Sequence, residues 1–300
     1  MQPQTSRQQI LSYILLVFVL NVPFDYFMIR AHSIRAGGLL YAWGIMWCPA
    51  LAAIAVLKLN GRKLSELGWG WGKPKYQAMA WLIPLLYASI SYVIVWAGGL
   101  GGVPNPEFVQ RTTSEMALNL SPSLSMVIYV LLTGSLGLVI QVSATLGEEI
   151  GWRGFMVPEL AKTTSFTLTA LISGAVWAVG HYPSLLFSDY NGGTPGWFGI
   201  PCFTVGIVAM SFVLAWLSLR SGSLWTATIM HASHNLYIQD IFTPLTRMIT
   251  PRSTSTEYTR SAILGVWLAL VGWTPRFGAA DIPQPSALCG KHSFHSQERC

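Results

Sequence analysis

The sequence predicts an all-α, polytopic integral membrane protein with seven or eight transmembrane helices. Only 10% of its 300 residues are charged, while 52% are hydrophobic and 13 are tryptophans. Such a chain lacks the charge that covers the surface of a water-soluble domain. Eight stretches contain no Asp, Glu, Lys or Arg. About 20 apolar residues cross the hydrocarbon as a helix, because a helix satisfies its own backbone hydrogen bonds in lipid.

The charge-free stretches are taken as spans in chain order. They are 8–24, 36–57, 76–106, 116–147, 163–188, 190–219, 221–239 and 261–275. The first seven are close to the length of a span or longer. The eighth has a short apolar core, Ala262 to Trp273, and a tail rich in Pro, Ser and Gly follows it. The sequence therefore predicts seven spans and leaves an eighth open.

The positive charges indicate the orientation and exclude one class of partner. Nine Lys and Arg residues lie on the side of the N-terminus and six on the other side, before the tail is counted. Cytoplasmic loops carry the excess of Lys and Arg, so we expect both termini in the cytoplasm. The net charge of +6 includes no run of five basic residues. We therefore expect the lipid bilayer, and no nucleic acid, as a partner.

Ionisable side chains inside the spans are the candidates for function, because each costs about 2.5–3.5 kcal/mol at mid-helix on insertion scales. Three clusters stand out: 147–153, 177–181 and 231–235. Taken alone, each could be a hydrogen-bonded core histidine or a charged helix end. Three clusters at helical spacings in three separate spans favour a functional site.

The first cluster contains a pair of glutamates with different expected roles. Glu149 and Arg153 lie four residues apart, so they share a helix face and can pair, which offsets the cost of burying either charge. Glu148 points about 100° away and is left as a carboxylate without a local partner. Such a carboxylate suits a general base. We expect His181, from another span, to meet Glu148 across a cavity and to hold a water molecule there.

The third cluster contains two donors on one helix face. His231 and Asn235 lie four residues apart, and both can donate to an oxygen that develops negative charge. His234 points away from Asn235 and is the weaker candidate. A base, a water-positioning histidine and two donors indicate hydrolysis of a carbonyl compound. No GxSxG motif and no cysteine beside a histidine supplies an alternative nucleophile.

A few polar residues near span ends are expected to be structural. Asp25, Gln239 and Asp240 are expected at the interface or between helices. Asn21 together with Pro23 is expected to kink the first span.

The ordered motifs resemble the CPBP family of membrane-embedded proteases, which includes the eukaryotic type II CaaX prenyl proteases and bacterial Abi and bacteriocin-immunity proteins. The family pattern is Glu-Glu-x-x-x-Arg, then an aromatic residue-x-x-x-His, then His-x-x-x-Asn. In this chain it reads Glu148-Glu149…Arg153, Trp177…His181 and His231…Asn235. Phe is usual where Trp177 stands. The resemblance covers residues 143–237, about a third of the chain.

The resemblance implies an endopeptidase that cuts within or beside the membrane. Glu148 and His181 would activate water. His231 and Asn235 would form the oxyanion hole. Glu149 and Arg153 would hold the site together or steer the terminus of the substrate.

The resemblance also implies a division of the chain and a class of substrate. Residues 1–124 would hold the N-terminal helices and loops, 125–245 the catalytic core, and 246–300 the last short span and polar tail. The substrate would be a membrane-associated or lipidated protein or peptide, for example a prenylated CaaX protein. The location would be the endoplasmic reticulum or a bacterial inner membrane.

Alternatives remain open from the sequence. No cofactor is favoured, since HExxH spacing is absent, but Glu148, His181 and His231 could also form a zinc set. The same side chains could relay protons in a transporter, although no internal repeat supports one. A catalytically silent membrane scaffold is the third alternative.

The predicted spans impose a geometric constraint. Glu148 lies near one end of the fourth span, whereas His181 lies late in the fifth, which starts on the same side of the membrane. We therefore expect the fifth span, or the segment before it, to be short, bent or re-entrant.

Overall fold

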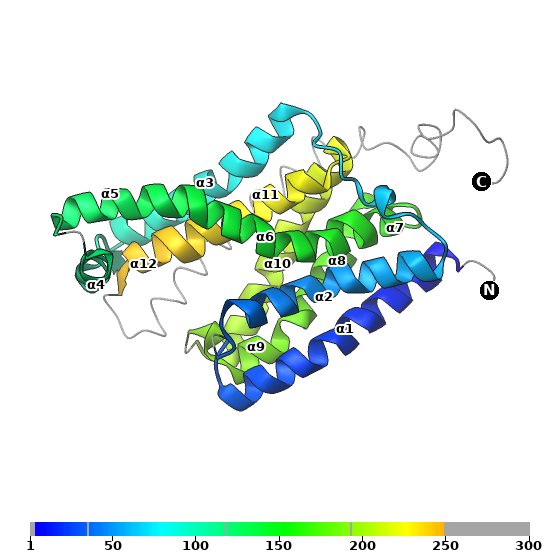
Figure 1. Cartoon of the computed structure of the whole chain (residues 1–300), viewed down its shortest axis with the longest axis horizontal. Coiled ribbons are helices and arrows are strands. Elements are labelled where there is room, and N and C mark those ends of the chain that lie inside the picture. The colour runs from blue at the N-terminus through cyan, green and yellow to red at the C-terminus, as the bar shows by residue number, and fades with distance from the viewer. Residues whose placement is uncertain (1–3, 35, 118, 193, 249–300) are drawn as a thin grey trace.

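The fold is described by a computed structural model that covers residues 4–34, 36–117, 119–192 and 194–248. It is almost entirely helical, which confirms the predicted all-α class (Figure 1). Within these ranges the strands are one antiparallel pair of two residues each, with Gly101 opposite Met248.

The elements follow in chain order. They are α1 (Ser6–Ala31), α2 (Gly38–Leu59), η1 (Leu64–Leu67), α3 (Pro74–Ala97), β1 (Gly101–Gly102), α4 (Pro106–Met116), α5 (Pro122–Leu132), η2 (Thr133–Gly137), α6 (Leu138–Glu149), η3 (Ile150–Met156), α7 (Val157–Ala161), α8 (Phe166–Gly180), α9 (Tyr182–Phe187), η4 (Asp189–Asn191), α10 (Gly196–Ser221), α11 (Leu224–Asn235), η5 (Leu236–Phe242), α12 (Thr243–Leu245) and β2 (Arg247–Met248). Of these, η2, η3 and η5 are π-helical turns inside longer helices, and η1 and η4 are 3₁₀ turns.

Six helical runs in the described part of the chain are long and apolar enough to cross a membrane. They are Ser6–Ala31, Leu40–Leu59, Pro74–Ala97, Pro122–Ala161, Phe166–Phe187 and Gly196–Ser221. These match the first six predicted spans. The seventh predicted span lies in the run α11–η5–α12, which is helical but is not among the six. The eighth, 261–275, lies outside the described residues, as does most of the predicted segment 246–300.

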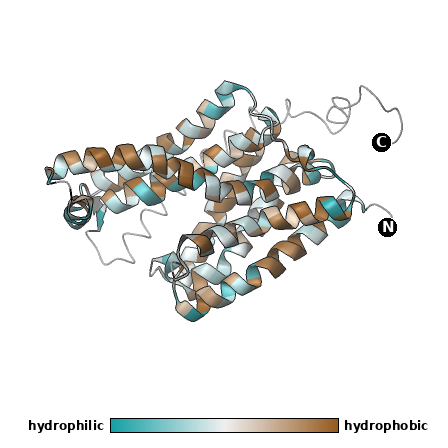
Figure 2. Ribbon diagram, in the orientation of Figure 1, coloured by the Kyte–Doolittle hydropathy of each residue, from teal (hydrophilic) through white to brown (hydrophobic). Residues whose placement is uncertain are grey.

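The outer surface of the bundle carries large apolar side chains, as a lipid-facing surface should. On α1, Leu11, Leu15, Val19 and Val22 are each more than half exposed. Figure 2 shows hydrophobic residues along the outward sides of the long helices. The apolar helices support a multi-pass integral membrane protein.

The fourth span does not end at Glu148, which corrects the predicted boundary. One helical run continues from Pro122 to Ala161 through two π-helical turns (Figure 1). Charged residues interrupted the charge-free stretch but not the helix, because the protein interior buries them. Glu148 lies 13 residues before the end of this run, and His181 lies 15 residues after the start of α8 at Phe166.

The length of the helical run Pro122–Ala161 also allows Glu148 and His181 to meet, as the predicted site requires. A short turn joins the run at Ala161 to α8, and α7 and α8 are in contact. At 1.5 Å per residue, Glu148 and His181 lie about 20 Å and about 22 Å from that turn. They therefore reach the same depth on adjacent helices. The fifth span, Phe166–Phe187, has the full length of a span, but its helix is interrupted at His181, between the end of α8 at Gly180 and the start of α9 at Tyr182.

Local sequence signals explain where these helices begin. The side chains of Ser121 and Ser165 accept hydrogen bonds from the backbone N–H groups of Leu124 and Leu168 at the starts of α5 and α8. Each satisfies one N–H group that the first turn leaves free. Thr5 forms a complete capping box at the start of α1.

Two glycines allow α2 to approach the helix that carries the glutamates. A Cβ atom on Gly147 would lie 2.6 Å from the ring of Trp47. A Cβ atom on Gly151 would lie 2.5 Å from both the Cβ of Pro49 and the hydroxyl of Tyr13. The two glycines are four residues apart and so lie on one face. This is the small-xxx-small arrangement that lets membrane helices pack closely.

A third glycine brings α8 and α10 together. A Cβ atom on Gly174 would lie 2.7 Å from the backbone of Val208 and 3.1 Å from the hydroxyl of Ser211. The close approach places Ser211 where it can reach the helix that carries the glutamates.

We predict that Gly151→Ala lowers stability and that the matched change Gly134→Ala does not. A Cβ atom on Gly134 would meet nothing within 4 Å. Overpacking costs about 1–3 kcal/mol, so the thermal unfolding midpoint of purified protein in detergent should fall by several degrees for Gly151→Ala only. Equal midpoints for the two variants would contradict the proposed packing of α2 on α6 and η3.

Candidate active site

The three sequence motifs meet at one cavity. Glu148 on α6, His181 after α8, and His231 and Asn235 on α11 all line a cavity of about 320 Å³. Glu148 is 7% exposed, His231 5% and Asn235 9%. The α1 and α2 helices supply the opposite wall, including Val17 and Pro49. A cavity of this volume whose wall includes a carboxylate, two imidazoles and a carboxamide has the composition of a hydrolytic site.

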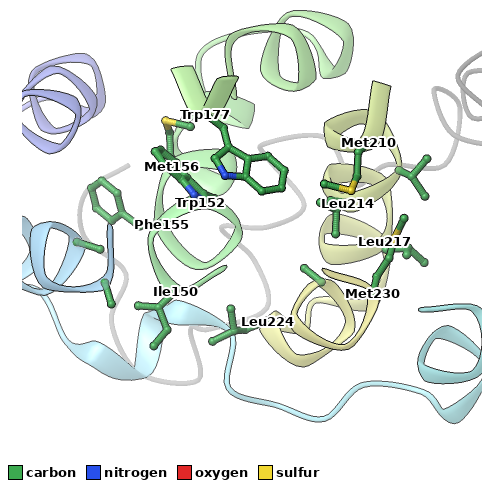
Figure 3. Close-up of a cluster of buried hydrophobic side chains, with 14 of the residues drawn as sticks. Ile150, Trp152, Phe155, Met156, Trp177, Met210, Leu214, Leu217, Leu224 and Met230 are labelled. Carbon is green, nitrogen blue, oxygen red and sulfur yellow. The ribbon is translucent and has the colours of Figure 1, made fainter. Parts of the chain in front are cut away.

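Glu148 is held by two tryptophans. Its Oε2 accepts hydrogen bonds from Trp177 Nε1 at 2.7 Å and Trp152 Nε1 at 3.4 Å. The expectation that Glu148 has no local partner was therefore wrong, because Trp152 lies one turn along the same helix. Within the described residues Oε1 accepts no hydrogen bond, so this oxygen is left for a molecule in the cavity. Figure 3 shows Trp152 and Trp177 among the side chains of the buried apolar core.

Trp177 contacts residues of all three motifs. Its ring lies 4.5 Å from the guanidinium carbon of Arg153 and 5.0 Å, edge to face, from the ring of His231. Phe is usual at this position in the resembling family, and a phenyl ring could stack in the same way. Only the indole also supplies an N–H group for Glu148. The departure from the family pattern therefore adds a hydrogen bond to the candidate base.

Glu149 and Arg153 form the expected ion pair beneath the cavity. Arg153 Nη1 lies 2.9 Å from Glu149 Oε1, and both side chains are 0% exposed. Arg153 Nη2 also donates to Ser211 Oγ on α10 at 3.2 Å. Neither Glu149 nor Arg153 is among the residues that line the cavity. Of the two roles that the resemblance implies, this position fits holding the site together.

Glu149 also orients His231. The same Oε1 atom lies 2.9 Å from His231 Nδ1. Because a carboxylate only accepts hydrogen bonds, Nδ1 carries the proton and Nε2 is the nitrogen left for the cavity.

His181 is fixed by the backbone. Its Nδ1 lies 3.0 Å from the carbonyl oxygen of Trp177, so Nδ1 donates and Nε2 can accept. The ring packs against Phe203 at 5.2 Å. His181 and Glu148 share no direct hydrogen bond among those that the structure gives, so a water molecule between them is the simplest link.

A chain of amides orients Asn235. Its Oδ1 accepts from Gln239 Nε2 at 3.2 Å, and its Nδ2 lies 3.4 Å from Gln141 Oε1. Gln141 in turn donates to Asp240 at 2.8 Å. With Oδ1 occupied, Nδ2 has a second hydrogen for the cavity. Asp240 is interhelical, as expected, whereas Gln239 is part of the cavity wall.

His234 does not line the cavity, in agreement with its description as the weaker candidate. Its Nδ1 is hydrogen-bonded to the hydroxyl of Tyr87 on α3, and the two rings pack together.

Sequence reasoning missed several residues of the site. Trp152 lies at the i+4 position from Glu148 and Gln141 at the i−7 position, so helical spacing alone could have found both. Asn21 and Asp25 on α1 line the cavity too, although a kink and an interfacial position were expected for them. No spacing could reveal this, because it depends on how α1 packs against the core.

The residues fit a zinc ion poorly as they stand. The described part of the chain contains no group of three or more His, Cys, Asp or Glu side chains placed to hold a metal ion.

We predict that Glu149 and Arg153 are strongly coupled. Arg153→Met should cost about 3–5 kcal/mol, because it leaves a buried carboxylate without its partner. The double variant with Glu149→Gln should cost clearly less than the sum of the single variants. Equilibrium unfolding in mixed detergent micelles of defined composition measures the free energy of unfolding of each variant.

The exposed pair Arg111 and Glu115, 3.9 Å apart, is the matched control for this cycle. The corresponding variants Arg111→Met and Glu115→Gln should change stability by less than about 0.5 kcal/mol. Additive effects at Glu149 and Arg153 would contradict the coupling.

Comparison with known proteins agrees with this geometry. Residues 128–237 match the model of a family described as type II CAAX prenyl endopeptidase Rce1-like. A relative from Methanococcus maripaludis named CAAX prenyl protease 2 is 27% identical over 96 residues, which are 30% of this chain and 34% of the relative. The match thus spans about a third of the relative's length. Both findings confirm the resemblance that the motifs predict and support placing this core of the chain in the CPBP family of membrane proteases.

Proposed function

We propose that this protein is an intramembrane endopeptidase that hydrolyses a peptide bond in a membrane-associated, lipidated protein, with a prenylated CaaX protein as the leading substrate class. One observation carries the proposal. Motifs from three helices line one cavity, and the carboxylate among them keeps one oxygen free of hydrogen bonds within the described residues. The family match supports the same class of reaction.

Water is the nucleophile in this mechanism. A water molecule binds between Oε1 of Glu148 and Nε2 of His181. Glu148 takes one proton from the water molecule while the water oxygen attacks the carbonyl carbon of the substrate. The two tryptophan N–H groups on Oε2 hold the carboxylate in place for this transfer.

The oxyanion that forms is stabilised by two donors. Asn235 offers Nδ2, and His231, whose ring Glu149 orients through Nδ1, turns Nε2 to the cavity, where a proton on this nitrogen supplies the second donor. Donors that are already oriented need no reorganisation when the charge develops. Glu148 then returns the proton to the leaving nitrogen as the C–N bond breaks, so the products are a carboxylic acid and an amine.

The expected setting of this reaction follows from the charge pattern. We propose that the termini are cytoplasmic and that the cavity opens toward that side, in the endoplasmic reticulum or a bacterial inner membrane. The lipid anchor of the substrate would then stay in the bilayer while its peptide reaches Glu148.

We predict that Glu148→Gln abolishes cleavage, with a loss of at least about a thousandfold, because the amide cannot accept the proton. The measurement compares peptide termini in membranes that contain the wild type or Glu148→Gln at equal abundance. New termini should appear only with the wild type, and their sequences would identify the substrate. Glu115→Gln, on the exposed face of α4, is the matched control and should keep full activity.

Other outcomes distinguish the alternatives. Identical termini with both folded proteins would contradict the protease and favour a transporter or a scaffold. Activity that a zinc chelator removes and added zinc restores would favour the Glu148–His181–His231 zinc set.

A further inference from the structure

The α1 helix places two polar side chains in the cavity wall opposite the motifs. Asn21 and Asp25 both line the cavity and lie four residues apart, on the face that also carries Tyr13 and Val17. Tyr13 packs edge-on against Trp152, with ring centroids 5.7 Å apart, and Trp152 donates to Glu148. This face of α1 therefore starts beside Glu148 at Tyr13 and continues along the cavity to Asn21 and Asp25. Both residues lie outside the matched segment 128–237.

Asn21 is buried without a hydrogen-bond donor. Its side chain is 8% exposed, and its Oδ1 has no partner among the described residues. Leaving a buried amide oxygen unpaired costs about 1–3 kcal/mol. This oxygen is closed to solvent in the structure, so rotation of the Asn21 amide turns it to the cavity, where the N–H group of a peptide backbone can donate to it.

Asp25 gives this wall a negative charge. It is half-buried, and no hydrogen bond or ion pair joins it to another described residue. The described residues that line the cavity include two carboxylates, Asp25 and Glu148, and no Lys or Arg. A cavity charged in this way attracts a cationic side chain and repels an anionic one.

We propose that Asn21 and Asp25 form a substrate-binding subsite that selects a basic residue near the cleaved bond. Asn21 Oδ1 accepts a hydrogen bond from a backbone N–H of the substrate, and Asp25 pairs with a Lys or Arg side chain. The two positions are about 6 Å apart along the helix. An extended peptide covers about 3.3 Å per residue, so the basic residue lies about two residues from the backbone position that Asn21 holds.

The subsite rests on the proposed function for its substrate class, but it can be tested by binding alone. The protein carries Glu148→Gln throughout, so that no probe is cleaved. The probes are fluorescein-labelled peptides with one farnesylated cysteine, identical except for a single Lys, Gln or Glu placed at each position in turn. Fluorescence anisotropy in detergent gives the Kd of every peptide.

At one position, the Lys peptide should bind about tenfold more tightly than the Glu peptide. Asp25→Asn should reduce this difference to less than about twofold, and Asp25→Lys should reverse the preference at the same position. Glu115→Gln, which removes a carboxylate from an exposed surface, should leave the preference unchanged.

Asn21→Leu separates a binding role from a structural one. It should weaken all peptides alike by about two- to tenfold, the equivalent of one lost hydrogen bond. Its thermal unfolding midpoint should not fall, because Asn21 Oδ1 has no partner to lose within the described chain. A lower midpoint with unchanged binding would assign Asn21 a structural role and overturn its place in the subsite.

Equal binding of Lys, Gln and Glu peptides, a preference that survives Asp25→Asn, or no binding of any peptide would overturn the subsite. Failure of the proposed function looks different. In that case peptide termini would be the same with the wild type and Glu148→Gln, while a charge preference that depends on Asp25 could still be measured.

Discussion

The architecture of the site depends on one buried oxygen, Oε1 of Glu149. It accepts hydrogen bonds from Arg153 and from His231, each at 2.9 Å. Through Arg153 it is linked to Ser211 on α10 and to the ring of Trp177 on α8. One carboxylate thus fixes the relative positions of four helices. A buried ion pair seldom adds net stability, so what it supplies here is geometry: His231 is oriented, and Trp177 is held where it reaches Glu148.

This arrangement requires close helix packing on both sides. Gly147 and Gly151 admit α2 against the helix that carries the glutamates, and Gly174 admits α10 against α8. Without these approaches Ser211 could not reach Arg153, and α1 and α2 could not close the far wall of the cavity. The π-helical turns η3 and η5 begin directly after Glu149 and Asn235. Such turns are frequent at functional sites; here η3 contains Arg153 of the first motif, and η5 follows the third motif.

The sequence was informative where function depends on spacing within one helix. Pairs at i and i+4 predicted the bond between Glu149 and Arg153 and the common direction of His231 and Asn235. Charge-free runs predicted the first six spans. The same rule wrongly placed the end of the fourth span at Gly147, whereas the helix continues to Ala161. Buried charges interrupt an apolar run without ending the helix. The roles of Asn21 and Asp25 could not be read from spacing, because they arise from contacts between α1 and helices more than a hundred residues away.

The central claim is that Glu148 activates a water molecule and does not itself attack the substrate. A single turnover in H₂¹⁸O, with enzyme in excess over a cleavable peptide, tests this most directly by mass spectrometry. The account predicts one ¹⁸O atom in every new C-terminal carboxylate and no ¹⁸O in the peptide that contains Glu148. Product without ¹⁸O, together with ¹⁸O in the Glu148 side chain, would show a covalent acyl-enzyme and contradict the account.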